Sequence, residues 1–433
     1  MTAPALILAA PASGSGKTTL TLALLRAFRN RGVRVASFKI GPDYIDPAFH
    51  AAASGRPCPN IDTWAMRPDT VAAIIADLCA DAELVIGEGV MGLFDGAAGG
   101  GGSTADVAVA LGLPTVLVHD VKGQSASAAA VVEGFANHRD DVHVAGVIFN
   151  YVGSEHHAAL LKKACANLEQ IHAGAVPRDD RLAIPDRHLG LVQAVEHDGL
   201  ERFLDSAAEL VAAHVDLDRL TAMARVPTTP APKAQNSIAP IGQRIAIAAD
   251  TAFAFAYHHL AEIWRAQGAE LSPFSPLADE APPPADAVYL PGGYPELHAG
   301  HLATNARFLD GLRTVATSGT AVYGECGGYM VLGEGLVDGD GARHRMAGLL
   351  PLETSFARPR LHLGYRQLTL AADTPLGPAG ACFRGHEFHY VEGNPSDAAP
   401  LFEASDSLGQ PLGPAGLRAG RVMGSFIHLV DAA

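Results

Sequence analysis

Residues 5–19 read ALILAAPASGSGKTT. The apolar run over residues 5–10 predicts a buried strand, and the Gly/Ser loop after it leads into helical apolar spacing from Thr18 to Phe28. Short apolar runs also cover residues 33–40, 83–86, 114–119 and 144–149, with helical stretches between them. Strands that alternate with helices predict a parallel sheet covered on both faces. The first half of the chain is therefore expected to be an α/β domain.

The loop after the first strand carries a phosphate-binding pattern. Gly16, Lys17 and Thr18 match the end of G-x-x-x-x-G-K-[ST], and Pro11 stands in place of the first glycine. In such a loop, backbone N–H groups surround a phosphate, the lysine reaches the outer phosphates and the hydroxyl binds Mg²⁺. The sequence therefore predicts a site for ATP and Mg²⁺. Its nucleotide-binding residues are expected to be Ser13, Gly14, Ser15, Gly16, Lys17, Thr18 and Thr19.

Charged residues follow two other predicted strands. Glu88 ends the strand in ELVIGEG and is expected to hold Mg²⁺ together with the loop threonine. Lys39 ends the strand before GPDYIDP, which carries Asp43 and Asp46, and Asp95 lies in the Gly-rich loop after Glu88. Because strand ends line the ligand crevice of an open α/β sheet, Lys39, Asp43, Asp46 and Asp95 are predicted catalytic residues. Asp95 also fits an ordinary turn, and GPD and DP are common turn dipeptides.

A proline-rich stretch separates the two halves. Residues 226–243 lose hydrophobic periodicity, which predicts a linker between an ATP-binding domain at 1–225 and a second domain at 244–433. Apolar strands at 244–249, 287–290 and 320–323 restart the alternating pattern. We therefore expect two doubly wound α/β domains, a P-loop parallel sheet followed by a flavodoxin-like one.

The second half carries a candidate nucleophile. Cys326 lies in TAVYGECGG between an apolar strand and a helical stretch, which is the arrangement of a nucleophile elbow. The helix N-terminus is expected to lower the thiol pKa. The N–H groups of Gly327 and of Gly293, from LPGGYPE, are the predicted oxyanion donors. His428, in GSFIHL, is the predicted base, with His386 and His389 of GHEFHY as alternatives.

Composition limits the function further. The 433 residues carry a net charge of −15, with 48% apolar and 18% charged residues, which is typical of a globular protein. Nucleic-acid and anionic-membrane binders need a basic face, so neither partner is expected. The five scattered cysteines form no CxxC pair and predict neither disulfides nor structural zinc. With the apolar N-terminus interpreted as a strand, we expect a cytoplasmic protein without a membrane span.

Taken together, APASGSGKTT, KIGPDYIDP, EGVMGLFDG, RHLGLV, LPGGYPE, YGECGGYM, GHEFHY and GSFIHL resemble the cobyrinic or hydrogenobyrinic acid a,c-diamide synthase family over essentially the whole chain. The resemblance implies a dethiobiotin-synthetase-like ATP domain fused to a class I glutamine amidotransferase domain, with Cys326 as nucleophile and His428 as its activator. It also implies an adenine contact for Asn150 and substrate contacts for Arg187 and His188. The family of triad glutaminases usually has Glu two residues after the His, where this chain has Val430. The third group is therefore left open.

The resemblance implies a glutamine- and ATP-dependent ligase that amidates the a and c acetate carboxylates of a corrinoid macrocycle in cobalamin biosynthesis. The reaction would run through an acyl phosphate, with ammonia supplied by glutamine hydrolysis. The alanine-rich, lysine-poor composition is typical of high-GC bacteria, in which the cobalt-free route is common. We therefore expect hydrogenobyrinic acid as the substrate in preference to cobyrinic acid. Two alternatives are the sibling cobyric acid synthase and a P-loop regulatory ATPase with a non-catalytic glutaminase-like domain. P-loop regulatory ATPases usually carry a second lysine early in the loop, at the position where this chain has Ala12. The oligomeric state, a homodimer included, stays open.

Overall fold

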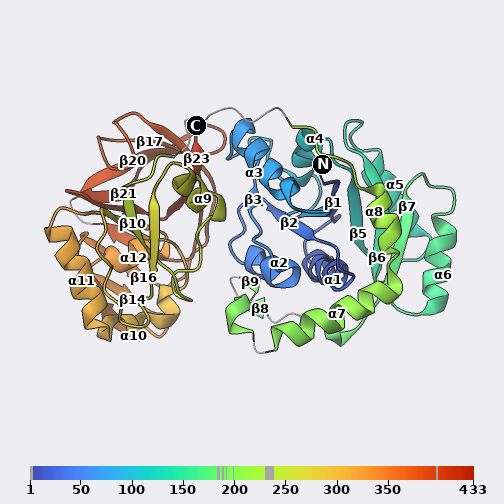
Figure 1. The fold of residues 1–433 in the computed structure, drawn as a ribbon, viewed down its shortest axis with the longest axis horizontal. Helices are drawn as coiled ribbons and strands as arrows, with labels where there is room; N and C mark the ends of the chain where they lie inside the picture. Colours follow the sequence, from blue (N-terminus) through green and yellow to red (C-terminus); the bar gives the residue numbers. More distant parts are fainter. Residues whose placement is uncertain are drawn as a thin grey trace. The chain divides into compact units, whose positions relative to one another are not determined.

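The computed structural model describes residues 3–182, 186–187, 190–191, 193–197, 199–229, 238–395 and 398–433. The chain divides into two compact units (Figure 1). The first holds Met1–Trp64, Pro68–Gly96 and Gly100–Lys233, and the second holds Ala65–Arg67, Ala97–Gly99 and Ala234–Ala433. Among the described residues, no helix combines the length and the apolar character needed to cross a membrane.

The first unit is built on a seven-stranded sheet in the order β3-β2-β4-β1-β5-β6-β7, in which every neighbouring pair is parallel. The strands are β1 (Ala5–Ala9), β2 (Val35–Ile40), β3 (Asn60–Ile61), β4 (Leu84–Glu88), β5 (Thr115–Asp120), β6 (Val144–Val152) and β7 (Ile171–Pro177), with a separate pair, β8 (Asp186–Arg187) and β9 (Gly190–Leu191). The helices are α1 (Lys17–Asn30), α2 (Asp46–Ser54), α3 (Pro68–Ala80), α4 (Thr104–Leu111), α5 (Ser127–Ala136), α6 (Glu155–Ala164), α7 (Leu200–His214) and α8 (Leu217–Met223).

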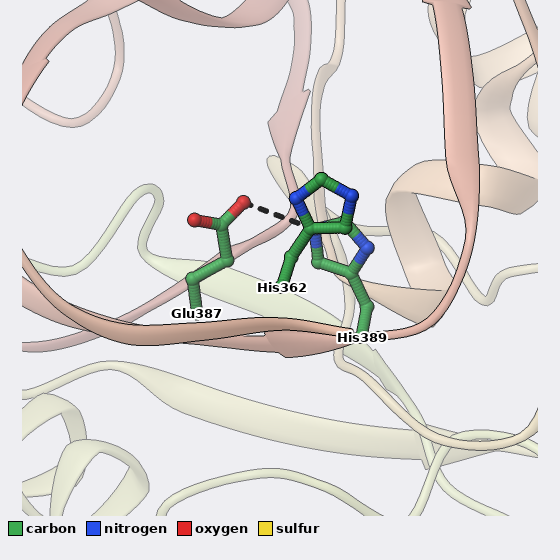
Figure 2. A group of neighbouring side chains, drawn as sticks. All are labelled: His362, Glu387 and His389. Carbon is green, nitrogen blue, oxygen red and sulfur yellow. Dashed lines mark hydrogen bonds and ion pairs between the residues drawn. The ribbon is translucent and has the colours of Figure 1, made fainter. Parts of the chain in front are cut away.

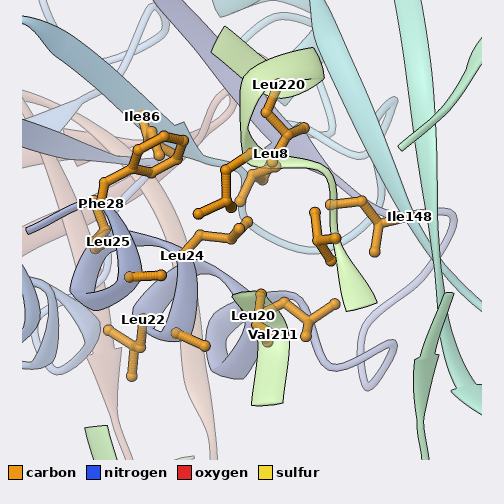
Figure 3. Close-up of a cluster of buried hydrophobic side chains, with 14 of the residues drawn as sticks. Leu8, Leu20, Leu22, Leu24, Leu25, Phe28, Ile86, Ile148, Val211 and Leu220 are labelled. Atoms are coloured by element: carbon orange, nitrogen blue, oxygen red, sulfur yellow. The ribbon is translucent and has the colours of Figure 1, made fainter. Parts of the chain in front are cut away.

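Helices pack on both faces of this sheet, as the near-continuous apolar strands require. On one face, Leu20, Leu24 and Phe28 recur every four residues along α1 and so share one side of the helix. They lie among side chains from β1, β4, β6, α7 and α8 in a single buried cluster (Figure 3). On the other face, α4, α5 and α6 contribute to a second cluster that includes Leu117 and Phe149. The predicted α/β class is confirmed.

The second unit contains a ten-stranded sheet in the order β11-β10-β12-β13-β22-β21-β20-β17-β18-β23. Its first five strands are parallel, and the remaining pairs are antiparallel. The strands are β10 (Arg244–Ala248), β11 (Glu270–Phe274), β12 (Ala287–Leu290), β13 (Ala321–Glu325), β17 (His362–Leu370), β18 (Cys382–His389), β20 (Ala399–Ser405), β21 (Pro411–Ala419), β22 (Val422–Ser425) and β23 (Ile427–Ala432).

In the described part of the second unit, a small sheet and four α-helices accompany the large sheet. The small sheet has the order β15-β14-β16-β19, with β14 (Gly335–Val337), β15 (Arg343–Arg345), β16 (Leu352–Ser355) and β19 (Glu392–Pro395). The helices are α9 (His258–Ala266), α10 (Ala299–Thr304), α11 (Ala306–Thr317) and α12 (Gly327–Leu332). The α/β class again agrees with the prediction, but the antiparallel strands from β17 onward were not predicted. Of these, β17, β18, β20 and β21 have mixed burial patterns, so they lack the continuous apolar runs that mark buried parallel strands.

Candidate active sites

The phosphate loop lies between β1 and α1 in the first unit. Gly16 has φ 80°, and a Cβ there would lie 2.2 Å from Nδ2 of Asn150, so only glycine fits. Asn150 is buried at the end of β6, and its Nδ2 donates to the carbonyl oxygen of Ser15 at 3.0 Å. The structure thus shows Asn150 holding the loop, while its adenine contact stays a prediction. Ser13 and Gly14 are exposed at the crest of the loop.

A cluster of buried charges lies next to the loop. The Lys39 ammonium donates to Asp46 Oδ2 at 2.5 Å and to Glu88 Oε1 at 2.7 Å, and lies 3.7 Å from Asp43 Oδ2. Parallel pairing of β2 with β4 sets Lys39 opposite Glu88. Burial alone would lower the pKa of Lys39, but the carboxylates of Asp46, Glu88 and Asp43 outweigh it and raise the pKa well above its usual value. The structure therefore brings these four predicted residues together.

The same cluster offers oxygen atoms suited to a magnesium ion. The Thr18 hydroxyl donates to Glu88 Oε1 at 2.6 Å and lies 3.2 Å from Asp46 Oδ2. Mg²⁺ prefers hydroxyl, carboxylate and water oxygens, and the Lys39 ammonium already shows that positive charge is accommodated between these carboxylates. Thr18, Asp46 and Glu88 thus fit the ion. Burial and repulsion among carboxylates raise the pKa of Asp46 to about 6, against the attraction of Lys39.

His50 belongs to this cluster and was not predicted. It is fully buried on α2, with Nε2 2.7 Å from Glu88 Oε2. The spacing of four residues between Asp46 and His50 places both on one side of that helix, which is a signal that the sequence contained. His50 therefore fixes the second oxygen of Glu88 while Lys39 and Thr18 contact the first.

Two other predicted residues have different surroundings. Lys17 is buried, its Nζ donates to the carbonyl oxygen of Met91 at 3.3 Å, and burial lowers its pKa. Asp95 Oδ2 accepts a hydrogen bond from the N–H of Gly92 at 2.9 Å and so closes the turn after β4. This agrees with the alternative that Asp95 is an ordinary turn residue. Its catalytic role stays a prediction. The side chain of Arg187 and all of His188 lie outside the described residues.

In the second unit, Cys326 lies at a sharp turn between β13 and α12. Its backbone has φ 48° and ψ −106°, a strained conformation for a residue with a side chain. The turn is so tight that a Cβ on Gly328 would lie 1.9 Å from the carbonyl oxygen of Leu290. The small residues around Cys326 are therefore a steric requirement of a nucleophile elbow.

His428 on β23 packs beside this cysteine. A Cβ on Gly292 would lie 2.4 Å from His428 Cε1 and 3.2 Å from Cys326 Cβ, so one loop position contacts both side chains. A Cβ on Gly327 would lie 3.0 Å from the backbone nitrogen of Gly293, which makes the two predicted oxyanion residues neighbours. The structure thus brings together the predicted nucleophile, base and oxyanion groups.

The predicted protonation state of the thiol is wrong for this structure. Burial raises the pKa of Cys326 well above its usual value, and the nearby carboxylate of Glu296 adds to the rise. Burial also lowers the pKa of His428 to about 3. Desolvation of the Cys326 thiol outweighs the backbone N–H of Gly327, at the start of α12, which favours the thiolate. The resting pair is therefore a neutral thiol beside a neutral imidazole.

Glu325, which precedes the nucleophile, was also missed. Its carboxylate is buried, accepts from the hydroxyls of Tyr323 at 2.8 Å and Tyr289 at 2.7 Å, and lies 3.8 Å from His428 Nδ1. Sequence templates place the acid after the histidine, at Val430. That residue only offers its carbonyl oxygen, to Nε2 of His259 at 2.8 Å.

The alternative base His389 has other contacts. It forms a cluster with His362 and Glu387 (Figure 2), and its ring nitrogens lie 3.0 Å from the carbonyl oxygen of Val391 and 3.0 Å from Glu387 Oε1. The side chain of Arg366 contacts the other Glu387 oxygen at 2.7 Å. Both ring nitrogens of His389 therefore lie within hydrogen-bonding distance of protein oxygen atoms. Glu387 also lines a mostly apolar cavity of about 610 Å³.

These two sites define a glutamine amidotransferase joined to a P-loop nucleotide-binding unit, that is, a glutamine-dependent amidating ligase. Residues 6–192 match the family described as the CobQ/CobB/MinD/ParA nucleotide binding domain, and residues 244–432 match the CobB/CobQ-like glutamine amidotransferase domain. ATP use follows from the first match.

The whole chain also has similar relatives. It is 55% identical over 98% of its length to the hydrogenobyrinate a,c-diamide synthase of Rhizobium meliloti, covering 99% of that protein. It is 53% identical to the corresponding proteins of a Sinorhizobium species, over 99% of both chains, and of Rhodobacter capsulatus, over 98% of both. The chain belongs to the hydrogenobyrinate a,c-diamide synthase family, which confirms the resemblance found in its motifs.

Proposed function

We propose that this chain converts the a and c acetate carboxylates of hydrogenobyrinic acid into amides, with ATP, Mg²⁺ and glutamine, in the cytoplasm. The observation that carries the proposal is 53–55% identity over essentially the whole length of synthases named for this reaction. The geometry of both sites supports it, and the five cysteines are free, as in a reducing compartment.

The first unit would activate the carboxylate. A carboxylate resists ammonia because oxide is a poor leaving group, so phosphoryl transfer from ATP would first form an acyl phosphate. Lys17 and Lys39 would offset the negative charge that grows on the transferring group. Thr18, Asp46 and Glu88 would hold Mg²⁺, which when bound neutralises phosphate charge. Ammonia then displaces phosphate.

The second unit would supply that ammonia. Because both groups rest neutral, Sγ of Cys326 would attack the glutamine amide carbon while its proton passes to His428 Nε2. The N–H groups of Gly293 and Gly327 would stabilise the oxyanion. His428 then returns the proton to the leaving nitrogen, ammonia departs, and water hydrolyses the thioester to glutamate.

The test is to incubate the protein with ATP, Mg²⁺, glutamine and either hydrogenobyrinic or cobyrinic acid, and to measure product mass. We expect two acid-to-amide changes, with the cobalt-free macrocycle preferred. Cys326→Ala should abolish glutamine use and leave amidation by free ammonia intact. Preference for cobyrinic acid would contradict the substrate assignment. ATP hydrolysis without amidation of either macrocycle would favour the regulatory ATPase.

A further inference from the structure

Glu325 is connected to both members of the proposed catalytic pair, Cys326 and His428, through neighbouring backbone groups. It immediately precedes Cys326 in the chain, and its Oε1 accepts from the N–H of Leu429, next to His428, at 3.1 Å. The elbow and the histidine strand are not neighbours in the sheet order, so this hydrogen bond joins them directly. A single buried carboxylate therefore links nucleophile and base.

The hydrogen bonds of Glu325 also determine which oxygen faces the histidine. Oε1 accepts from both Leu429 and the Tyr323 hydroxyl, whereas Oε2 accepts from the Tyr289 hydroxyl. Oε2 is the atom 3.8 Å from His428 Nδ1. Three donors hold the carboxylate in place, and the oxygen with fewer of them faces the imidazole.

Among the residues that the structure describes, three other candidates are less suited to this role. Burial lowers the pKa of His386, its partner across β18 and β23, to about 3, so that ring is neutral and cannot stabilise an imidazolium by its charge. Glu387 is engaged by Arg366 and His389. Val430 is apolar, and its side chain offers no acceptor.

We propose that Glu325 is the positioning residue of the glutaminase: it directs Nδ1–H of His428 toward its carboxylate, leaves Nε2 to accept the Cys326 proton, and stabilises the imidazolium that forms. The inference rests on the proposed function of the second unit. The proton moves from Sγ to Nε2 as the carbon–sulfur bond forms and returns to the leaving nitrogen, so Glu325 is unchanged at the end. In other triads, an acid at this place maintains the reactive tautomer.

The test compares Glu325→Gln and Glu325→Asp with a matched control, Glu353→Gln. Glu353 forms an ion pair with Arg343 in the same unit, and both of these side chains are about half exposed. Glutamine keeps the size of the side chain and, through its amide oxygen, can keep the two hydrogen bonds that Oε1 accepts, whereas aspartate keeps the charge. We expect Glu325→Gln to lower kcat for glutamine hydrolysis about 10²- to 10⁴-fold with KM nearly unchanged. Aspartate should restore part of kcat, and ammonia-supported amidation should stay at the wild-type level.

The inference would be overturned if Glu325→Gln kept the wild-type kcat. It would also be overturned if the kcat of Glu325→Gln were higher than that of Glu325→Asp. If Glu325 were only a structural hydrogen-bond acceptor, Glu325→Gln would have the higher kcat, because the isosteric amide preserves packing better than the shorter acid. If Glu325→Gln does not fold, the aspartate variant still decides, since loss of all activity in a folded Glu325→Asp also contradicts the role. A wild-type protein without glutaminase activity, or an active Cys326→Ala, would instead defeat the proposed function.

Discussion

Gly292→Ala is expected to disable glutamine hydrolysis while sparing the ligase reaction. The new Cβ would lie 2.4 Å from His428 Cε1, 3.1 Å from His428 Nε2 and 3.2 Å from Cys326 Cβ. Carbon atoms in contact normally lie about 3.5 Å or more apart, so the imidazole must retreat by about 1 Å. The loop itself has little room to move, because Gly293 lies against the backbone of Ala252.

A displacement of about 1 Å in a reacting pair costs about 100-fold in rate, which corresponds to about 2.7 kcal/mol of transition-state stabilisation. The overpacked loop should also lower the free energy of unfolding by about 1–3 kcal/mol. We therefore expect glutamine-supported amidation to fall about 100-fold and ammonia-supported amidation to remain.

The assay measures product formation with each nitrogen donor, and unfolding by circular dichroism in denaturant. Gly339→Ala is the matched control, because a Cβ at that position meets no atom within 4 Å. If Gly292→Ala kept more than half of the wild-type rate with glutamine, the pair beside Gly292 would not be the catalytic pair. Equal loss with both donors would point to general misfolding.

Three further perturbations test other parts of the structure. Leu24→Ala opens a cavity in the fully buried cluster of the first unit and should cost about 2–5 kcal/mol of unfolding free energy, measured in denaturant. Burial raises the pKa of Glu296 to about 8, so above that pH its carboxylate raises the pKa of Cys326, and Glu296→Gln should let iodoacetamide alkylate that thiol faster at about pH 9.5; an unchanged rate contradicts the electrostatic effect. Glu387 has a pKa of about 2 despite its burial, because its histidine and arginine partners outweigh desolvation. Its stabilisation, about 3 kcal/mol, is therefore present above the unfolded value near 4.5 and lost as pH falls toward 2. The difference in unfolding free energy between wild type and Glu387→Gln should shrink over that window, and a difference that stays constant would contradict the assignment.

Local patterns were sufficient for much of this protein. The phosphate loop around Lys17 and the elbow around Cys326 are contiguous, and each places small residues where the backbone must turn or approach another group closely. Alternation of apolar strands and helices gave the α/β class for the same reason, since periodicity depends on neighbours in the chain. Grouping Lys39 with Glu88 was also possible, because both end parallel strands and such ends share one edge of the sheet.

Burial and long-range contacts were decided only by the tertiary structure. His50 and Glu325 join their sites through contacts with Glu88 and with the strand of His428, which no local pattern records. The sequence predicted a lowered pKa for Cys326 from the helix N-terminus, but burial raises this pKa. Desolvation depends on how completely the surrounding chain excludes water, which the sequence does not show, whereas a helix end can be predicted from it. The sequence by itself determined which chemical groups are present and on which turns. The three-dimensional packing decided which of them meet and how they are charged, because contact and dielectric environment are properties of the folded chain.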